Sequence, residues 1–472
     1  MPFFMTQGFG AFNDNVFKNA LAALLVFESS KMAGLNTDQL VNFSAMVFIL
    51  PFFLFSALFG QFADKYEKSM QIRRVKLLEV VIMLLATLGF WLDNVPLLMF
   101  VLFLLGLQST IFGPIKYGIL PRILKREELV GGNALIEMGT FVAILGGTIA
   151  GPQLAGIEAS WPYWASAACL AVAVTGYLFS LRIPPSPAVA PDLEISWNIF
   201  AETVRNMKFI NQNRTVLNSV LGISWFWFFG AIFLVQIPSY TQNVLGGDKH
   251  LMSALLALFI IGISTGSLLC ERLSGKQVEI GLVPFGAIGL TPFGLDLYFA
   301  SPEAPVAGIT VMEFLADGNN WRIVIDLLLI GTFGGFYIVP LYALVQSRSE
   351  QDHLSRVIAG LNILNSLFMV VAAVSAMLIL GPAGLSIPEL FLISAVLNAV
   401  VAVYIFTLVP EFLMRFLVWI LIHTIYRVKV TGMDHIPEEG PVILASNHVS
   451  FADPLILGGM IRRPVNFVMY HK

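Results

Sequence analysis

Long apolar stretches separated by short polar segments run along the chain from its beginning to residue 409. An apolar window of about 20 residues is long enough to cross the hydrocarbon core of a bilayer as a helix. Such windows predict twelve membrane spans, at residues 8–29, 40–62, 72–92, 96–116, 130–156, 161–182, 214–239, 250–271, 280–300, 321–346, 356–381 and 386–409. A longer polar segment after the sixth span divides them into two sets of six.

The composition agrees with an all-α polytopic membrane protein. Hydrophobic residues make up 57% of the chain and charged residues only 12%, whereas charged residues make up about 25% of an ordinary globular protein. Lysines and arginines between the spans gather in the loops that follow the even-numbered spans. The positive-inside rule therefore predicts that these loops and both chain ends lie in the cytoplasm. The two cysteines, Cys169 and Cys270, fall in spans or at a span end, so no disulfide framework is expected.

Polar residues lie along one face of the first span. The members of this face are spaced by three and four positions and are Ala11, Asp14, Asn15, Lys18, Asn19 and Ala22. Ionisable groups are costly in hydrocarbon, so this face is predicted to line a water-filled cavity that receives a charged head group. The alternative is that Asp14 and Lys18 only neutralise each other near a helix end.

The fifth span contains a stripe of small residues that allows another helix to approach to backbone distance. Its members recur at every fourth position and are Gly139, Ala143, Gly147, Gly151 and Ala155. Glu137 lies on the same span, one turn after Asn133. Its carboxylate either pairs with Lys116, Arg122 or Lys18 or contacts the substrate, and the sequence leaves both interpretations open.

The loop between the second and third spans, GQFADKYEKSMQIRR, carries Gly60, Asp64, Lys65 and Lys68. It resembles the loop signature of the major facilitator superfamily, in which a glycine, an aspartate and basic residues lock the cytoplasmic ends of neighbouring helices. Two positions depart from that signature, because Glu67 replaces a usual glycine and Ser69 replaces a usual basic residue. A fainter copy at residues 266–276 indicates an internal duplication of six plus six helices.

Further phrases are AFNDN in the first span, FGPIKYGILP and GNALIEMGTF around the fourth and fifth, and RVIAGLNILNSLFMV in the eleventh. Together they resemble the bacterial lysophospholipid transporter branch of that superfamily over nearly all of residues 1–410. The resemblance implies a 12-helix major facilitator fold in the inner membrane. It also implies that lysophosphatidylethanolamine-like lipids move from the outer to the inner leaflet by alternating access.

In this interpretation Asp14 contacts the ammonium of the head group and Lys18 contacts the phosphate, with Asn15 and Glu137 as further substrate-binding residues. Membrane lipids are the other expected contacts. No cofactor, metal ion or nucleic acid is implied.

The segment 183–213 separates the predicted transporter halves, 1–182 and 214–410. It opens with a proline-rich linker and continues as an amphipathic helix that is predicted to lie along the cytoplasmic membrane surface. The apolar stripe of this helix consists of Trp197, Phe200, Val204, Met207 and Ile210. Beyond the second half, residues 411–426 are apolar but too short, and too interrupted by Arg415 and His423, for a thirteenth span, so we expect an interfacial helix there.

Residues 427–472 have the pattern of a soluble α/β segment, with a buried strand at 442–445 and a helix that begins at Asp453. Between them Asn447, His448 and Asp453 form an N-H-x-x-x-x-D pattern. Histidine can accept a proton from a hydroxyl, and a carboxylate can orient the imidazole. The alternative is a surface histidine beside a helix-capping aspartate.

The longer frame GMDHIPEEGPVILASNHVSFADP resembles the glycerolipid acyltransferase family. That resemblance implies that His448 is the general base on a lysophospholipid hydroxyl and that Asp453 orients it. A segment this short cannot bury a stable core by itself. We therefore expect it to be inactive alone and to be the start of a longer transporter–acyltransferase fusion, for which an acyl donor such as acyl carrier protein is a further expected partner.

Two other functions fit parts of the chain. The glycine-proline end of the fifth span is similar to that of exporters of drugs or small amphiphiles with the same fold. A membrane-anchored acyltransferase is the other, although twelve spans with duplicated loops exceed what an anchor needs.

Overall fold

The computed structural model describes residues 1–28, 37–155, 161–273, 282–408, 418, 424–425, 428, 430–432, 435–437, 441–447 and 449–461. The long helices are α1 (Pro2–Glu28), α2 (Thr37–Lys65), α3 (Lys68–Trp91), α4 (Val95–Gly118), α6 (Leu129–Ala155), α7 (Trp161–Ser180), α9 (Arg214–Tyr240), α10 (Lys249–Leu273), α11 (Leu282–Ala300), α13 (Trp321–Arg348), α14 (Leu354–Leu380) and α15 (Ile387–Leu408). Shorter helices are α5 (Leu120–Ile123), α8 (Ile199–Gln212), α12 (Val311–Ala316) and α17 (Asp453–Met460). Each predicted span coincides with one long helix, so the all-helical prediction is confirmed for the described residues up to 408.

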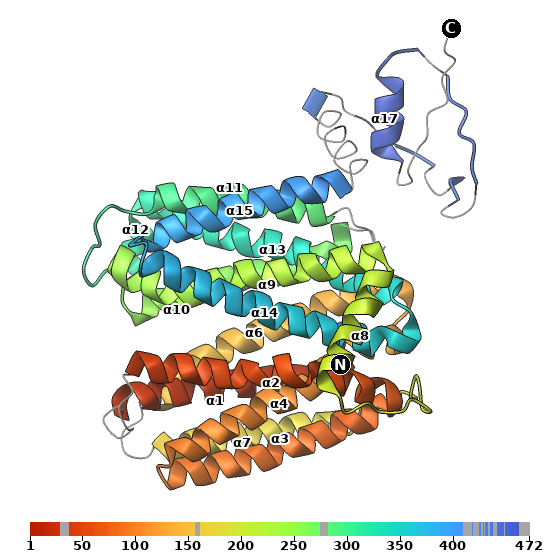
Figure 1. Cartoon of the computed structure of the whole chain (residues 1–472). Coiled ribbons are helices and arrows are strands. Elements are labelled where there is room, and N and C mark those ends of the chain that lie inside the picture. The colour runs from red at the N-terminus through yellow and green to blue at the C-terminus, as the bar shows by residue number, and fades with distance from the viewer. Residues whose placement is uncertain are drawn as a thin grey trace. The chain divides into compact units, whose positions relative to one another are not determined.

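Ten of the described helices are long and apolar enough to cross a membrane. The two other long helices, α1 and α3, are those whose apolar stretch is interrupted by polar and charged residues. Met1–Asn398 form one compact unit and Ala399–Lys472 form another. Within the first unit, α1 to α7 gather in one group and α9 to α14 in a second group beside it (Figure 1).

Small residues bring α1 and α6 into backbone contact. A Cβ atom added at Gly147 would lie 2.7 Å from the carbonyl oxygen of Phe12, and one at Gly151 would lie 2.8 Å from that of Val16. The predicted stripe of small residues on α6 is therefore confirmed as a helix-packing surface. This packing fixes the orientation of the polar face of α1 relative to α6.

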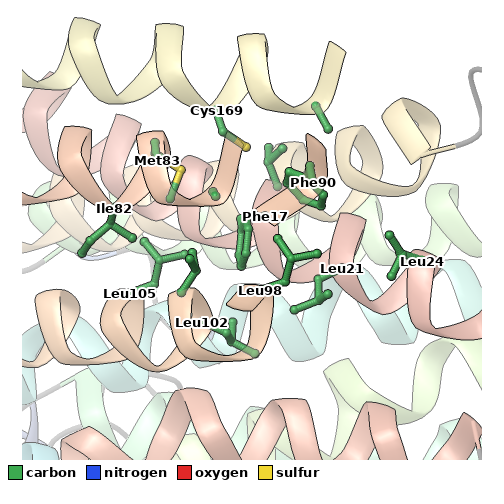
Figure 2. Close-up of a cluster of buried hydrophobic side chains, with 14 of the residues drawn as sticks. Phe17, Leu21, Leu24, Ile82, Met83, Phe90, Leu98, Leu102, Leu105 and Cys169 are labelled. Atoms are coloured by element: carbon green, nitrogen blue, oxygen red, sulfur yellow. The ribbon is translucent and has the colours of Figure 1, made fainter. Parts of the chain in front are cut away.

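A buried apolar cluster anchors the other end of α1. Phe17, Leu21 and Leu24 of α1 pack with side chains of α3, α4 and α7, among them Met83 and Leu98 (Figure 2). Lipid tails are as apolar as these side chains, so close packing rather than exclusion from water stabilises the contact. The apolar residues of α1 are thereby held in place, and the polar residues that precede them on the same helix are held with them.

The helix α8 packs on the protein through Glu202, Asn206 and Ile210, which are buried. Trp197, Phe200 and Val204 of the predicted apolar stripe are exposed instead. Their exposure is compatible with the predicted contact with the membrane surface, which stays a prediction.

In the second unit the predicted strand at 442–445 is wrong, because residues 441–447 have no strand structure. A strand needs a neighbouring strand to pair its backbone groups, and the described part of this unit supplies none. The predicted helix start at Asp453 is confirmed, since α17 begins there with proline in its first turn. Most of the predicted interfacial helix, 411–426, lies outside the described residues.

Candidate functional site

A cavity of about 260 Å³ lies between the two groups of helices. It is lined by Gln7, Gly10, Ala11, Asp14, Asn15, Phe48, Phe52, Lys76, Gln108, Ser109, Phe112, Gly113, Lys116, Tyr117, Thr140, Ile144, Trp227 and Asn362. Nine polar or charged side chains and five aromatic ones thus share one space. Most of the lining comes from the first half, and Trp227 and Asn362 come from the second.

The polar face of α1 turns toward this cavity. Oδ2 of Asp14 accepts a hydrogen bond from the hydroxyl of Ser109 at 2.6 Å, while Oδ1 is buried without a protein partner among the described residues. Asn15 also lines the cavity and donates from its amide to the carbonyl of Ala11. Lys18 lies one turn further along, with its ammonium 5.7 Å from the centre of the Phe48 ring. The structure therefore places Asp14 and Asn15 together in the lining and places Lys18 beside it.

A buried polar network lies beside Asp14, and two of its members, Lys76 and Gln108, also line the cavity. Lys76 Nζ lies 2.6 Å from Glu79 Oε2, and both side chains are almost fully buried. Glu79 also accepts hydrogen bonds from Asn13 and Gln108, at 3.0 and 3.3 Å. Sequence reasoning missed this network, and the available signal was a lysine and a glutamate three positions apart inside a predicted span. A buried ion pair of this kind persists only where further hydrogen bonds satisfy it.

Thr140 of α6 contacts two other polar side chains of the lining. Lys116 Nζ donates to Thr140 Oγ1 at 2.8 Å, and Oε1 of Gln7 lies 3.0 Å from the same oxygen. Lys116 therefore brings an ammonium to the cavity. The sequence offers Lys116 only as a partner for Glu137, and no sequence pattern singles out Gln7.

Glu137 is fully buried and does not appear in the cavity lining. Its Oε1 accepts a hydrogen bond from the hydroxyl of Tyr117 at 2.6 Å. Tyr117 lines the cavity and stacks on Tyr342 of the second half, with ring centres 4.3 Å apart. Glu137 thus positions a lining residue, which favours a structural role over direct contact with a substrate.

The two halves meet at the end of the bundle that carries the α2–α3 and α13–α14 loops, here named the basic end. Asp64 at the end of α2 accepts hydrogen bonds from the backbone N–H of Ser355, at 3.3 Å, and from Arg356 Nε, at 3.2 Å. Both donors belong to the first turn of α14, where the helix dipole favours a carboxylate. Lys68 Nζ lies 4.0 Å from Asp64 Oδ1 and donates to the hydroxyl of Ser355 at 3.1 Å.

Gly60 allows α2 and α14 to approach each other beside this contact. A Cβ atom at Gly60 would lie 2.7 Å from the Cβ of Ala359. The ammonium of Lys65 instead lies 5.9 Å from the centre of the Tyr66 ring, which belongs to the same half. Of the four loop residues singled out in the sequence, Gly60, Asp64 and Lys68 meet the second half, and Lys65 lies apart.

A second contact between the halves joins α6 to α13. The amides of Asn133 on α6 and Gln346 on α13 exchange two hydrogen bonds, at 2.7 and 3.0 Å, and both side chains are fully buried. This amide pair and the stacked pair Tyr117 and Tyr342 thus add two buried contacts between the halves.

In the second unit Asp453 folds back onto the preceding turn. Its Oδ2 accepts the backbone N–H groups of Val449 and Ser450, at 2.6 and 2.7 Å. His448, its predicted partner, lies outside the described residues.

The family model of the Major Facilitator Superfamily matches residues 3–318, which is more than half of the chain. The chain belongs to this superfamily. A second family model, that of acyltransferases, matches residues 427–472.

Members of the superfamily with a curated name resemble most of the chain. The lysophospholipid transporter LplT of Escherichia coli O157:H7 is 28% identical over 356 residues, which cover 74% of this chain and 80% of the relative. The lysophospholipid transporter LplT of Serratia proteamaculans is 28% identical over 354 residues, which cover 73% and 79%.

Solved transporters share the fold at low identity. The human organic anion transporter MFSD10 has a TM-score of 0.59 and 12% identity, with 84% of this chain and 99% of that chain covered. The transporter FucP of the superfamily, in its outward conformation, has a TM-score of 0.58 and 12% identity over 84% and 97%.

Glu67, which departs from the superfamily loop signature, holds the segment that joins the halves. Its Oε1 accepts hydrogen bonds from the Ser69 hydroxyl, at 2.5 Å, and from the backbone N–H of Ser186, at 2.7 Å. Its Oε2 accepts the N–H of Met70 at 2.7 Å, in the first turn of α3. A glycine here would leave these donors without their acceptor, so the departure from the signature has a structural reason.

We expect Glu67→Gln to lower the Tm of the purified protein by roughly 2–5 °C at pH 7. Partial burial opposes ionisation of this carboxyl, but the hydrogen bonds from Ser69, Ser186 and Met70 outweigh it and hold the pKa of Glu67 below its usual 4.5. A carboxylate with a depressed folded-state pKa stabilises the fold above the unfolded pKa, and this stability is lost as the pH falls through the folded pKa. The difference in Tm should therefore persist down to about pH 4.5 and shrink below it.

Thermal unfolding in detergent between pH 7 and pH 3.5 measures this difference. Glu303→Gln, at an exposed position in the α11–α12 loop, is the matched control and should change the Tm little at pH 7. Equal Tm values for the wild type and Glu67→Gln at pH 7 would contradict the role given to this carboxylate.

Proposed function

We propose that the protein carries lysophospholipids, such as lysophosphatidylethanolamine, from the outer to the inner leaflet of a bacterial inner membrane by alternating access. The names of its relatives support this substrate class. Membership of the Major Facilitator Superfamily supports the transport mechanism.

The observation that carries the proposal is the presence of opposite charges in one cavity that also has aromatic side chains in its lining. Asp14 presents an unpartnered carboxylate oxygen, and Lys116 presents an ammonium, among Phe48 and Phe112. A zwitterionic head group has both complementary charges, and its single acyl chain is compatible with apolar walls. We assign the ammonium of the lipid to Asp14 and its phosphate to Lys116, in place of Lys18, whose ammonium faces Phe48 outside the lining.

The remaining site residues have supporting roles in this proposal. Asn15 completes the polar lining beside Asp14, and Glu137 positions Tyr117. The contacts of Gly60, Asp64 and Lys68 with α14 keep the basic end closed while the substrate enters from the opposite end.

The distribution of positive charge supports a cytoplasmic position for the basic end and for both chain ends. Opening of the contacts at that end would then release the lysolipid into the inner leaflet. There we propose that residues 427–472 belong to the acyltransferase that consumes it, with His448 as general base on the lysolipid hydroxyl and Asp453 as its orienter. This assignment rests on the acyltransferase match to the same residues.

Transport of a fluorescent lysophosphatidylethanolamine into proteoliposomes tests the proposal. The protein should accelerate movement of the lipid across the bilayer relative to protein-free vesicles, and unlabelled lysolipid should compete. A cationic drug that is transported equally well and is not inhibited by lysolipid would support an exporter instead. Absence of any acceleration would remove the proposed function.

A further inference from the structure

Two amide groups in the cavity carry N–H donors that lack a protein acceptor. Gln7 is 2% exposed, and its Nε2 is buried without a hydrogen-bond partner among the described residues. Nδ2 of Asn362 is likewise buried without one. An unsatisfied buried donor costs about 1–3 kcal/mol, so two such groups around one cavity indicate an acceptor that binds there.

The first donor lies beside Lys116. Gln7 and Lys116 both contact the hydroxyl oxygen of Thr140, at 3.0 and 2.8 Å. This shared contact uses the carbonyl end of the Gln7 amide and leaves its N–H end without an acceptor among the described residues. One ammonium and one amide donor therefore converge from α1 and α4.

The second donor reaches the same region from the other half of the protein. A Cβ atom at Gly113 would lie 2.6 Å from Nδ2 of Asn362, so the absence of a side chain at Gly113 admits the amide. Gly113 and Lys116 are three residues apart on α4, and residues at this spacing lie on the same helix face. Asn362 thus approaches the wall that carries Lys116.

We infer that Gln7, Lys116 and Asn362 together bind the phosphate of a phosphodiester head group, and that Asn362 is the ligand contributed by the second half. This inference rests on the proposed function and extends it to residues that neither charge nor sequence pattern singles out. Three N–H groups, one of them charged, suit the oxygens of a phosphodiester.

The phosphate site is distinct from the position of the lipid ammonium. Asp14 lies seven residues after Gln7 on the same face of α1, which corresponds to about 10 Å along the helix. The Asp14 carboxylate with its unpartnered Oδ1 and the three N–H donors therefore form two poles of one cavity. A head group with both charges would occupy both poles. It would also contact the two halves at once, since Asn362 lies on α14.

Binding measurements with three single-chain lipids separate the two poles. Lysophosphatidylethanolamine has a phosphate and an ammonium, lysophosphatidylglycerol has only the phosphate, and an O-acyl ethanolamine has only the ammonium. Asn362→Asp and Gln7→Glu replace a donor with a carboxylate of nearly the same size. Each should lower the affinity for both phosphate-containing lipids by about 10-fold or more and leave that for the O-acyl ethanolamine within about twofold.

Asn211→Asp makes the same chemical change at an exposed position of α8 and should leave all three affinities unchanged. The Tm of each variant shows that it is folded. Unchanged affinity of both variants for the phosphate-containing lipids would overturn the inference, and so would an equal loss for all three lipids. A wild-type protein that binds no lysolipid would instead remove the proposed function and this inference with it.

Discussion

Asp14→Ala is expected to abolish flipping of lysophosphatidylethanolamine and to weaken its binding by roughly 10- to 100-fold. A hydrogen bond to a charged group contributes about 1.5–3 kcal/mol, and each 1.4 kcal/mol corresponds to about a tenfold change in affinity. The Oδ1 atom of Asp14 is buried in the cavity without a partner among the described residues, so its interaction with the lipid ammonium has little competition from the protein. Lysophosphatidylglycerol lacks the ammonium and should lose far less affinity.

The binding and flipping of both lipids are measured on the purified variant in proteoliposomes. Asp192→Ala removes an exposed carboxylate of the linker and serves as the matched control. Unchanged flipping of lysophosphatidylethanolamine would rule out the assignment of Asp14. An equal loss for the two lipids, with an unchanged Tm, would show that Asp14 acts on the transport cycle and not on the ammonium.

The second large effect is expected at the basic end, where Asp64→Asn should open the contact between the halves. The substitution leaves Arg356 and Lys68 buried without the carboxylate that they share. Removal of one member of a buried ion pair costs about 3–5 kcal/mol. Because Asp64 meets Arg356 and the Ser355 N–H only while the halves are together, the loss of these contacts falls on the closed arrangement and shifts the equilibrium by roughly 10²- to 10⁴-fold toward opening.

Spin labels on cysteines at Tyr66 and Gln351, which are exposed on the two halves, report this opening as a distance distribution. The wild type should show mainly the shorter distance and Asp64→Asn mainly a longer one. Asp192→Asn is the control, because the same chemical change there lies on an exposed stretch of the linker. An unaltered distribution in Asp64→Asn would mean that other contacts, such as Asn133 with Gln346, hold this end closed.

The helices were predictable because the bilayer imposes one length and one polarity on every span. The predicted span 214–239 and the helix α9 (Arg214–Tyr240) differ at their ends by a single residue. The prediction of a strand at 442–445 was wrong because no comparable constraint acts on a strand. A strand is stabilised by its neighbours, and apolar residues in a short window do not reveal whether a neighbour is present.

The site was only partly predictable. Charged residues within spans attract attention because burying them is costly, and this criterion identifies Asp14. Gln7 and Asn362 are neutral amides, which occur throughout membrane helices, and only their position around a shared cavity distinguishes them. The sequence alone indicates that Lys116 belongs to a loop, because it does not show that α4 continues to Gly118 and that this lysine lines the cavity.

The glycine contacts differ between the two halves. In the first half they join α1 to α6 and also α2 to α4, where a Cβ atom at Gly106 would overlap the carbonyl oxygen of Phe48. In the second half they join α10 to α13, where a Cβ atom at Gly266 would overlap the carbonyl oxygen of Thr332. The counterparts of α1 and α6 in the duplicated half are α9 and α14, which carry Trp227 and Asn362. On these two helices Gly222 meets side chains of α13 and Gly360 meets those of α8. The α1–α6 wall of the cavity is therefore joined backbone to backbone, whereas the facing α9–α14 wall is joined through side chains such as Ser224 and Asn365, which can repack around head groups of unequal bulk.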